Sequence, residues 1–282
     1  GGAGFRMGPF ELMDTTGLDV SHPVMESIYT QFYDEPRFRP GPLTRQRSVA
    51  GLYGRKNGRG FYTYKDNKKI TPPAAPVPDL LPDAIWISRA EPAGRAALIA
   101  VLADKVAIDD AERPSSRSLC LFTPIGKDTT SCAVAEKIEP ERAFAVDTLF
   151  GLAGRRTVMS TPVSDTDFRD QVHAALAAGG HAVTTIHDSP GFVNQRVVAL
   201  VVNIACDIAQ QRIATPEDID KAVQLGLGYP QGPLAMGDAV GAPTILRILN
   251  ELMVFYGDPR YRPSPWLKRR AMLGISLLTP EN

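Results

Sequence analysis

An internal repeat is the feature that most constrains the fold of this 282-residue chain. The block Gly4–Gly17 returns as Gly228–Gly241 at an offset of 224 residues. Farther along, Asp34–Pro40 matches Gly257–Pro263 at an offset of 223. Two matched blocks in the same order indicate a duplicated structural module, and the one residue of slippage is a loop adjustment. The chain therefore contains two related modules separated by a long middle segment.

The two copies differ in completeness, because two predicted helices precede only the second copy. The first of these helices has apolar residues at helical spacing in apolar surroundings, which predicts burial on most sides. These residues are Val197, Val201, Ile204 and Ile208. The second begins with the cap-like run Thr215–Asp218 and stops at Gly226. Its apolar face consists of Ile219, Ala222 and Val223. We expect the sequence to begin inside a domain, as a piece of something longer.

The first copy continues into another predicted helix and a turn. Ser21 is the expected N-cap of that helix, and Pro23 fits its first turn. Val24, Ile28 and Phe32, spaced by four, form a stripe that we expect to face a core. The dipeptide Asn57-Gly58 then predicts a tight turn.

Proline marks the clearest boundary in the chain. A polar lead-in is followed by five prolines among alanine and valine, which favours an extended linker over residues 65–82. These prolines are Pro72, Pro73, Pro76, Pro78 and Pro82.

Short apolar runs alternate with helical patterns from residue 83 to residue 188. The expected strands are Ala84–Ser88, Lys105–Ile108, Ser118–Thr123, Phe144–Val146, Arg156–Ser160 and Val183–Ile186. The expected helices are Glu91–Ala103, Thr129–Ile138 and Asp165–Ala178, the last capped by Asp165 or Thr166. This alternation predicts a mostly parallel, doubly wound sheet.

Composition excludes several classes of protein. The formal net charge is zero, which gives no electrostatic reason to bind nucleic acid or an acidic membrane. The three cysteines match no zinc pattern and favour a reducing, cytoplasmic setting. The longest apolar stretch, Val197–Ala205, contains Asn203 and is too short to span a bilayer. The start, Gly1-Gly2-Ala3-Gly4, has no signal-peptide features.

Several ordered motifs resemble the 3-hydroxyacyl-CoA dehydrogenase family. They are Gly4–Asp14 with Gly54–Tyr62, Asp188–Arg196, Thr215–Ala222 and Gly226–Pro230. The resemblance covers residues 1–64 and 183–282, and the duplicated layout is similar to long bacterial members of phenylacetate and short-chain hydroxyacyl-CoA catabolism. Those members carry one complete unit followed by a degenerate one.

This resemblance implies four segments. Residues 1–64 are a truncated helical C-terminal domain, 65–82 a proline-rich linker, 83–188 a vestigial Rossmann-like domain, and 189–282 the second helical copy. It also implies that the parent enzyme uses NAD to oxidise 3-hydroxyacyl-CoA to 3-oxoacyl-CoA.

The groups that this reaction needs are missing from the degenerate unit. The expected glycine-rich turn reads Ser88–Gly94, with a single glycine, and places Glu91 and Pro92 where backbone amides should meet phosphate. The family's His-Phe-x-Asn-Pro block corresponds to Val146–Phe150, which has no histidine, and no glutamate follows before Glu217 to orient one. The family's junction asparagine corresponds to Gln195, with Asn194 displaced by one residue. We therefore predict no catalytic, cofactor-binding or metal-binding residue in this chain, and no NAD bound to it.

Isolated polar residues have a structural and a functional interpretation. His22, His173, His181 and His187 each stand alone and are interpreted as surface or structural, although His187 beside Asp188 leaves a dyad open. Cys120 and Cys132 are interpreted as buried apolar residues. Arg55, Lys56 and Arg59 either meet a CoA phosphate or belong to a solvated turn that positions Phe61 and Tyr62. Arg37, Arg39, Arg260 and Arg262 are interpreted as internal ion-pair or cap partners, and the Gly8-Pro9 and Gly232-Pro233 pairs as closely packed helix starts.

The leading hypothesis is a fragment of the dehydrogenase, inactive alone, in which residues 1–64 pack against 189–282 as an intramolecular pseudo-dimer. Acyl-CoA is then the substrate of the parent enzyme only, and a homodimer through the remaining surfaces stays open. One alternative is a stand-alone binding or scaffold module that uses a pocket in the degenerate sheet. Another is a related β-hydroxyacid dehydrogenase, which the Gly-Arg-Lys loop and the paired Gly-Pro blocks disfavour.

Overall fold

The computed structural model describes residues 3–72 and 76–281. Apart from the first four residues, the chain divides into two compact units: residues 5–75 with 258–261, and residues 76–257 with 262–282. Gly1, Gly2 and the linker proline Pro73 lie outside the described residues. Each unit is considered by itself below, and the four predicted segment boundaries stay a prediction.

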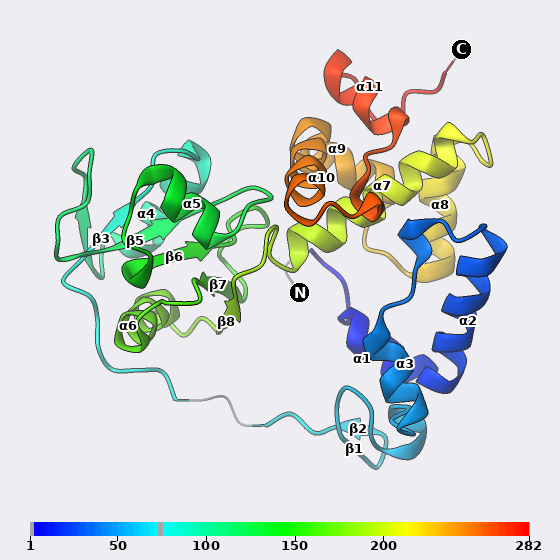
Figure 1. The fold of residues 1–282 in the computed structure, drawn as a ribbon, viewed down its shortest axis with the longest axis horizontal. Helices are drawn as coiled ribbons and strands as arrows, with labels where there is room; N and C mark the ends of the chain where they lie inside the picture. Colours follow the sequence, from blue (N-terminus) through cyan, green and yellow to red (C-terminus); the bar gives the residue numbers. More distant parts are fainter. Residues whose placement is uncertain (1–2, 73–75, 282) are drawn as a thin grey trace. The chain divides into compact units, whose positions relative to one another are not determined.

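The first unit consists of short helices and a small hairpin (Figure 1). Its elements are α1 (Pro9–Thr16), α2 (Leu18–Gln31), η1 (Pro36–Phe38), α3 (Pro42–Val49), η2 (Arg55–Asn57), β1 (Tyr64–Lys65), β2 (Lys68–Lys69) and η4 (Pro259–Tyr261). Pro9 occupies the first turn of α1, as expected for a Gly-Pro helix start. Gly58 has φ 81°, which confirms the turn at Asn57-Gly58.

The predicted start of α2 is wrong. The helix begins at Leu18 directly after Gly17, whose φ of 87° lets the chain turn sharply out of α1. Pro23 therefore lies inside the helix, and the Ser21 hydroxyl donates to the Gly17 carbonyl instead of capping the first turn.

The apolar stripe of α2 does not face a core, contrary to the prediction from its spacing. Val24, Ile28 and Phe32 are 50%, 39% and 50% exposed. The four-residue spacing correctly places them on one side of the helix. Phe32 lies against the Phe38 ring of η1, with centroids 4.7 Å apart, but all three side chains stay largely exposed.

A buried carboxylate organises the rest of the first unit. Asp14 has no exposed surface and accepts hydrogen bonds from the Phe61 and Tyr62 amides, both at 2.9 Å, and from the Tyr64 hydroxyl at 3.1 Å. A Cβ on Gly60 would lie 2.1 Å from Asp14 Oδ1, so this approach requires glycine. Burial, followed by the contact with Asp14, raises the pKa of Tyr64 to about 12. Asp14 thus holds in place the loop that contains Gly54-Arg55-Lys56, the Gly-Arg-Lys motif.

The η4 segment, which comes from the second repeat, packs against its counterpart η1 from the first repeat inside this unit. The Arg39 guanidinium donates to the Asp258 carboxylate, and the Arg260 guanidinium donates to the Arg39 carbonyl at 3.3 Å. Arg37 lies 3.7 Å from Glu35, and Arg260 lies 3.3 Å from Asp258, which is the same pairing in both repeats. Two copies of one sequence motif therefore contact each other within a single compact unit.

The second unit contains a six-stranded sheet in the order β4-β3-β5-β6-β7-β8. The strands are β3 (Ala84–Ile87), β4 (Ala107–Asp109), β5 (Ser118–Phe122), β6 (Ala143–Val146), β7 (Arg156–Ser160) and β8 (Val183–His187). All neighbours pair in parallel except β6 and β7, which are antiparallel. The predicted mostly parallel, doubly wound sheet, flanked in sequence by two helical copies, is confirmed.

Helices cover both faces of this sheet (Figure 1). They are α4 (Pro92–Leu102), α5 (Thr129–Glu136) and α6 (Thr166–Ala177), with a short η3 (Pro140–Arg142) before β6. Ile85 and Ile87 point into the core shared with α4 and α6, whereas Trp86 points into the core on the α5 side. The Asp165 carboxylate accepts from two amides at the start of α6, as predicted.

A helical subdomain completes the second unit. It contains α7 (Asn194–Gln210), α8 (Pro216–Leu227), α9 (Pro233–Val240), α10 (Ala242–Tyr256) and α11 (Pro265–Leu273). The long helix α7 is central, because α9, α10 and α11 all pack against it. It is buried on most sides, as predicted. Its most deeply buried side, however, contains Val198 and Val202, each one residue after Val197 and Val201 of the predicted stripe.

Helix α8 is partly as predicted. The Thr215 hydroxyl caps it by accepting from the Asp218 amide. The helix runs past Gly226 and ends before Gly228, which has φ 66°. Ala222 is exposed and therefore does not belong to the buried face.

Among the described residues, no single helix is long and apolar enough to cross a membrane. Helices α9 and α10 reach that length and hydrophobicity only when they are taken together, across a bend of 92°.

Candidate functional site

The place where a doubly wound sheet binds a ligand is the crevice at its topological switch point, outside the carboxyl ends of the strands. In this sheet the switch lies between β3 and β5, because the chain turns to β4 on one side of β3 and then returns to β5 on the other. A cavity of about 220 Å³ opens there. Its lining includes Ser88, Glu91, Thr123, Lys127, Cys132 and Arg247. The cavity is below the roughly 300 Å³ at which small-molecule pockets usually begin.

The first turn of α4 shows how this crevice is filled. Glu91 is the N-cap residue, and its carboxylate forms a two-pronged ion pair with Arg247 of α10, one arm of which measures 3.2 Å. Pro92, at the first helical position, has no N–H to offer. A carboxylate and a proline thus occupy a helix N-terminus that would otherwise favour phosphate.

Gly94 is a feature that the sequence alone did not explain. In the fingerprint G-x-G-x-x-G, the third glycine allows close packing between helix and strand. A Cβ on Gly94 would lie 2.3 Å from the Thr123 hydroxyl and 2.8 Å from the Thr148 hydroxyl. Counting back by the fingerprint spacing, Arg89 and Glu91 stand at the first two glycine positions. The packing glycine is therefore present, and the two that would approach a pyrophosphate are replaced.

The end of β4 is where this fold usually places an acid for the ribose hydroxyls. Asp110 there is paired with Arg89 at 3.0 Å and with Arg95 at 2.6 Å. Asp109 accepts from the Ser115 amide at 2.8 Å and the Ser118 hydroxyl at 2.6 Å. These hydrogen bonds lower the pKa of Asp109 to about 2. Asp109 is thus engaged inside the protein, whereas the Asp110 side chain is ion-paired but 74% exposed.

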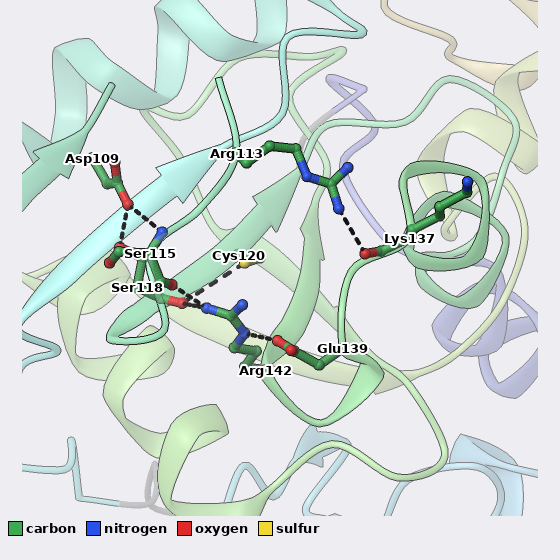
Figure 2. A network of polar contacts seen from close by, with 8 residues as sticks. All are labelled: Asp109, Arg113, Ser115, Ser118, Cys120, Lys137, Glu139 and Arg142. Atoms are coloured by element: carbon green, nitrogen blue, oxygen red, sulfur yellow. Dashed lines mark hydrogen bonds and ion pairs between the residues drawn. The ribbon is translucent and has the colours of Figure 1, made fainter. Parts of the chain in front are cut away.

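Figure 2 shows the contacts that hold residues 110–117, which connect β4 to β5 without a helix. Asp109 points at Ser115 and Ser118, while the Arg142 guanidinium donates to the carbonyls of the same two serines. Arg113 donates to the Glu136 and Lys137 carbonyls at 2.8 and 3.1 Å and so satisfies the C-terminus of α5. A fixed, short crossover replaces the longer connection typical of parallel strands.

The positions that correspond to the family's histidine block and junction asparagine do meet. The Gln195 amide, which has no exposed surface, donates to Asp147 Oδ1 at 3.0 Å and to the Pro124 carbonyl at 3.1 Å. Its oxygen accepts from the Gly126 amide at 2.9 Å. Asp147 is itself 8% exposed, and burial raises its pKa. The Gln195 side chain thus uses both amide hydrogens and its oxygen inside the protein, and the pair presents no histidine to a substrate.

Asp147→Asn is expected to stabilise the protein at neutral pH, on the order of 1 kcal/mol. A raised pKa means that folding favours the neutral carboxyl of Asp147. The resulting stability is complete below the ordinary aspartate pKa and is lost as the pH rises through the higher folded value. Asparagine is neutral throughout and keeps the Oδ1 acceptor for Gln195.

Urea unfolding at pH 7.5 and pH 4.5 checks this expectation, because the advantage of the variant should shrink at the lower pH. Asp170→Asn is the matched control, since Asp170 is an exposed partner of the neighbouring Arg169. A loss of stability for Asp147→Asn at pH 7.5 would contradict the proposed state of the carboxyl.

The isolated histidines and cysteines occupy structural positions. His22 is buried, with Nδ1 3.1 Å from the Thr44 hydroxyl and Nε2 3.3 Å from Glu26. Asp188 does not face His187; its carboxylate instead accepts from the Thr129 and Thr130 amides at the start of α5. His173 and His181 are half-buried and His187 is exposed. Cys120 and Cys206 are buried and Cys132 half-buried, and burial raises the pKa of each thiol to about 12.

The basic loop of the first unit is tied into that unit. Lys56 pairs with Asp19, and the Arg55 guanidinium stacks over Tyr64 at 5.5 Å. The predicted internal pairing of the repeat arginines holds for Arg37, Arg39 and Arg260, as described above. Close packing is correct for Gly232, but wrong for Gly8, where an added Cβ would meet no atom within 4 Å.

The residues at the switch point do not fit NAD. A pyrophosphate would meet the Glu91 carboxylate at the α4 N-terminus, where Pro92 has no N–H to donate. Among the residues that the structure describes, no cluster of three or more His, Cys, Asp or Glu side chains could hold a metal ion.

Comparisons with known proteins define the class. The family model "3-hydroxyacyl-CoA dehydrogenase, C-terminal domain" matches residues 1–64 and 191–275, just over half of the chain. The chain belongs to the 3-hydroxyacyl-CoA dehydrogenase family.

Two relatives give the extent of the likeness. The chain is 31% identical over 273 residues to the 3-hydroxyadipyl-CoA dehydrogenase of Escherichia coli K12, covering 96% of this chain and 52% of the relative. It is 38% identical over 95 residues to a probable 3-hydroxybutyryl-CoA dehydrogenase of Bacillus subtilis, covering 34% of this chain and 33% of the relative.

Solved structures agree on the fold. The crystal structure of 3-hydroxybutyryl-CoA dehydrogenase from E. coli K12 aligns with a TM-score of 0.73 and 28% identity, over 96% of this chain and 52% of that one. The (S)-3-hydroxybutyryl-CoA dehydrogenase of Ralstonia eutropha aligns with a TM-score of 0.56 over 71% of each chain, at 20% identity, which shows the fold alone. The chain spans about half the length of the E. coli relatives.

Proposed function

We propose that this chain is the C-terminal part of an NAD-dependent 3-hydroxyacyl-CoA dehydrogenase and that its own role is structural. The Glu91–Arg247 ion pair across the switch point is the main support, because it sets an internal carboxylate where the cofactor's phosphates would lie. The buried hydrogen bond between Gln195 and Asp147 supports the same conclusion at the position of the redox chemistry. Hydride transfer and acyl-CoA binding then belong to residues outside this chain, in a cytoplasmic parent enzyme.

The structural role that we propose is pairing of the two helical copies as a pseudo-dimer. The η1–η4 contact supports it, because matched segments of the two repeats meet there and share the Arg39–Asp258 ion pair. In shorter members of the family, the resemblance implies that such helical domains pair between two chains. A duplicated chain can supply both partners, and its remaining surfaces leave a homodimer possible.

NADH titration of residues 1–282, followed by nucleotide fluorescence, tests the proposal. We expect no saturable binding up to about 1 mM, a limit equivalent to roughly 4 kcal/mol of binding free energy. We also expect no oxidation of 3-hydroxybutyryl-CoA by this chain, whereas the parent protein should oxidise it. NADH binding at micromolar concentrations that Arg247→Ala abolishes would contradict the proposal.

A second candidate is a binding module without redox chemistry, which the cavity beside Cys132 and Arg247 favours. The complete reading frame separates the two. A glycine-rich strand-to-helix turn and a His-Phe-x-Asn-Pro block encoded upstream of residue 1 support the dehydrogenase, and an upstream region without them supports the binding module.

A further inference from the structure

The sheet and the helical subdomain of the second unit are joined by ion pairs along α10. The Glu91 carboxylate at the start of α4 forms its two-pronged ion pair with Arg247 of α10. One helical turn later, the Glu251 carboxylate lies 3.8 Å from the Lys127 ammonium, in the loop between β5 and α5. Both pairs therefore connect a group of the sheet region to the same helix of the subdomain.

The loop between β5 and α5 also packs directly on α10. Gly126 has φ 79°, and a Cβ there would lie 2.9 Å from the Glu251 Cβ and 3.0 Å from the Ile248 Cα. This approach requires glycine. The two parts thus touch through a close backbone contact as well as through the two ion pairs.

Within the described residues of the second unit, one short stretch of chain connects the sheet to the helical subdomain. Strand β8 ends at His187 and α7 begins at Asn194, so residues 188–193 form the connection. Two parts that are joined by one short segment can open and close by hinge motion. Contacts away from the connection therefore determine how often the cleft between the parts opens.

The cavity at the switch point lies between these two parts. Its lining includes Glu91 and Cys132 from the sheet region and Arg247 from α10. The hydrogen bond with Glu91 raises the pKa of Arg247, so the guanidinium stays charged. A carboxylate from one side of the cavity thus meets a cation from the other.

We propose that the Glu91–Arg247 ion pair is an internal latch, which holds the sheet and the helical subdomain closed over this cavity. In proteins with a hinged cleft, a ligand favours closure because it contacts both sides. Here a carboxylate and a guanidinium of the same chain make that contact. The inference does not depend on the proposed function, because it concerns the motion of the cleft and not the reaction of the parent enzyme.

The three cysteines report opening of the cleft separately from unfolding. Cys132 is half-buried in the cavity lining, whereas Cys120 in the sheet and Cys206 on α7 have no exposed surface. Burial raises the pKa of Cys132 to about 12, so this thiol should react slowly while the cleft is closed. The test is alkylation by iodoacetamide, an uncharged reagent, followed for each cysteine by mass spectrometry of its peptide.

Glu91→Gln keeps the size of the side chain and removes its charge. We expect Cys132 in this variant to be alkylated about three to ten times faster than in the unmodified chain, because water screens a partly exposed pair and limits its strength. Cys120 and Cys206 should stay unreactive. An unchanged rate at Cys132 overturns the proposal. An equal rise at all three cysteines also overturns it, because the pair would then stabilise the fold and not close the cleft.

The matched control is Arg89→Gln. Arg89 stands two residues before Glu91 and pairs with Asp110 at 3.0 Å, inside the sheet region. Its loss should leave the alkylation rate of Cys132 within about twofold of the unmodified chain. If the control accelerates Cys132 as much as Glu91→Gln does, the effect is not specific to the latch and the proposal fails.

Exchanging the two charges separates the ion pair from the shape of its side chains. Glu91→Arg and Arg247→Glu each place like charges in contact, and each should speed alkylation of Cys132 by about tenfold or more. The double variant forms the pair again with opposite polarity and should return to within about threefold of the unmodified rate. The return is incomplete because a cation at the start of α4 opposes the helix dipole. A double variant as fast as either single variant overturns the latch.

Raised salt gives a measurement on the unmodified chain, in which no substitution disturbs folding. At about 1 M NaCl the Debye length falls to about 3 Å, so a partly exposed ion pair weakens. We expect Cys132 to react at least about twofold faster than at low salt, with Cys120 and Cys206 unchanged. If the rate at Cys132 does not rise, the ion pair does not control the cleft.

Discussion

Replacing Asp14 by alanine is expected to lower the free energy of unfolding of the first unit by about 3–4 kcal/mol. The carboxylate has no exposed surface and accepts hydrogen bonds from the Phe61 amide, the Tyr62 amide and the Tyr64 hydroxyl. Alanine leaves these three donors without their acceptor and leaves a cavity beside Gly60. Because the loop between Gly54 and Tyr64 depends on this one group, its amides should lose protection first.

Hydrogen exchange resolved over residues 5–72 measures this effect, since both tryptophans of the chain, Trp86 and Trp266, belong to the second unit. The control is Lys56→Ala, which removes an ion pair made by a side chain that is 53% exposed, and should change stability by less than about 1 kcal/mol. Similar losses for the two variants would mean that Asp14 is not the organising group.

Gln195→Ala is expected to destabilise the second unit by about 3 kcal/mol. The substitution leaves the Gly126 amide and the Pro124 carbonyl unpaired, and it removes the donor that faces Asp147. All three partners belong to the region where β5 and β6 end, and Gln195 lies on α7. The loss should therefore appear in both the sheet and the helical subdomain.

Tryptophan fluorescence during urea unfolding reads this effect in the second unit alone, because Trp86 reports on the sheet and Trp266 on α11. Asn194→Ala is the matched control: the residue is next in sequence, on the same first turn of α7, and half-buried. A change below about 1 kcal/mol for Gln195→Ala would show that the buried network contributes little.

Local signals in the sequence predicted much of the fold. Thr215 and Asp165 cap the helices that they were expected to cap, because an N-cap depends on residues only two or three positions away. The six strands lie where short apolar runs predicted them, with ends shifted by at most two residues. The repeat itself predicted which helices would correspond.

The remaining features depend on contacts between residues far apart in the chain, and the sequence could not predict them. Arg247 and Glu91 are 156 positions apart, so no local sequence pattern around either residue predicts their ion pair. The sequence shows a single glycine at position 94 and predicts a lost fingerprint, because the packing role of this glycine depends on Thr123 and Thr148, which follow β5 and β6. The stripe Val24, Ile28 and Phe32 gave the correct side of α2, but helical periodicity does not state whether a partner is present to cover that side.

The contact between η1 and η4 joins the two copies of one repeated motif within a single polypeptide. In a symmetric pair of identical chains, every substitution changes both sides of such a contact at once. Here Glu35 and Asp258, or Phe38 and Tyr261, have already diverged, because each side mutates alone. A contact held within one polypeptide also survives dilution, because the chain that joins its two sides sets their effective concentration and the amount of protein in the cell does not.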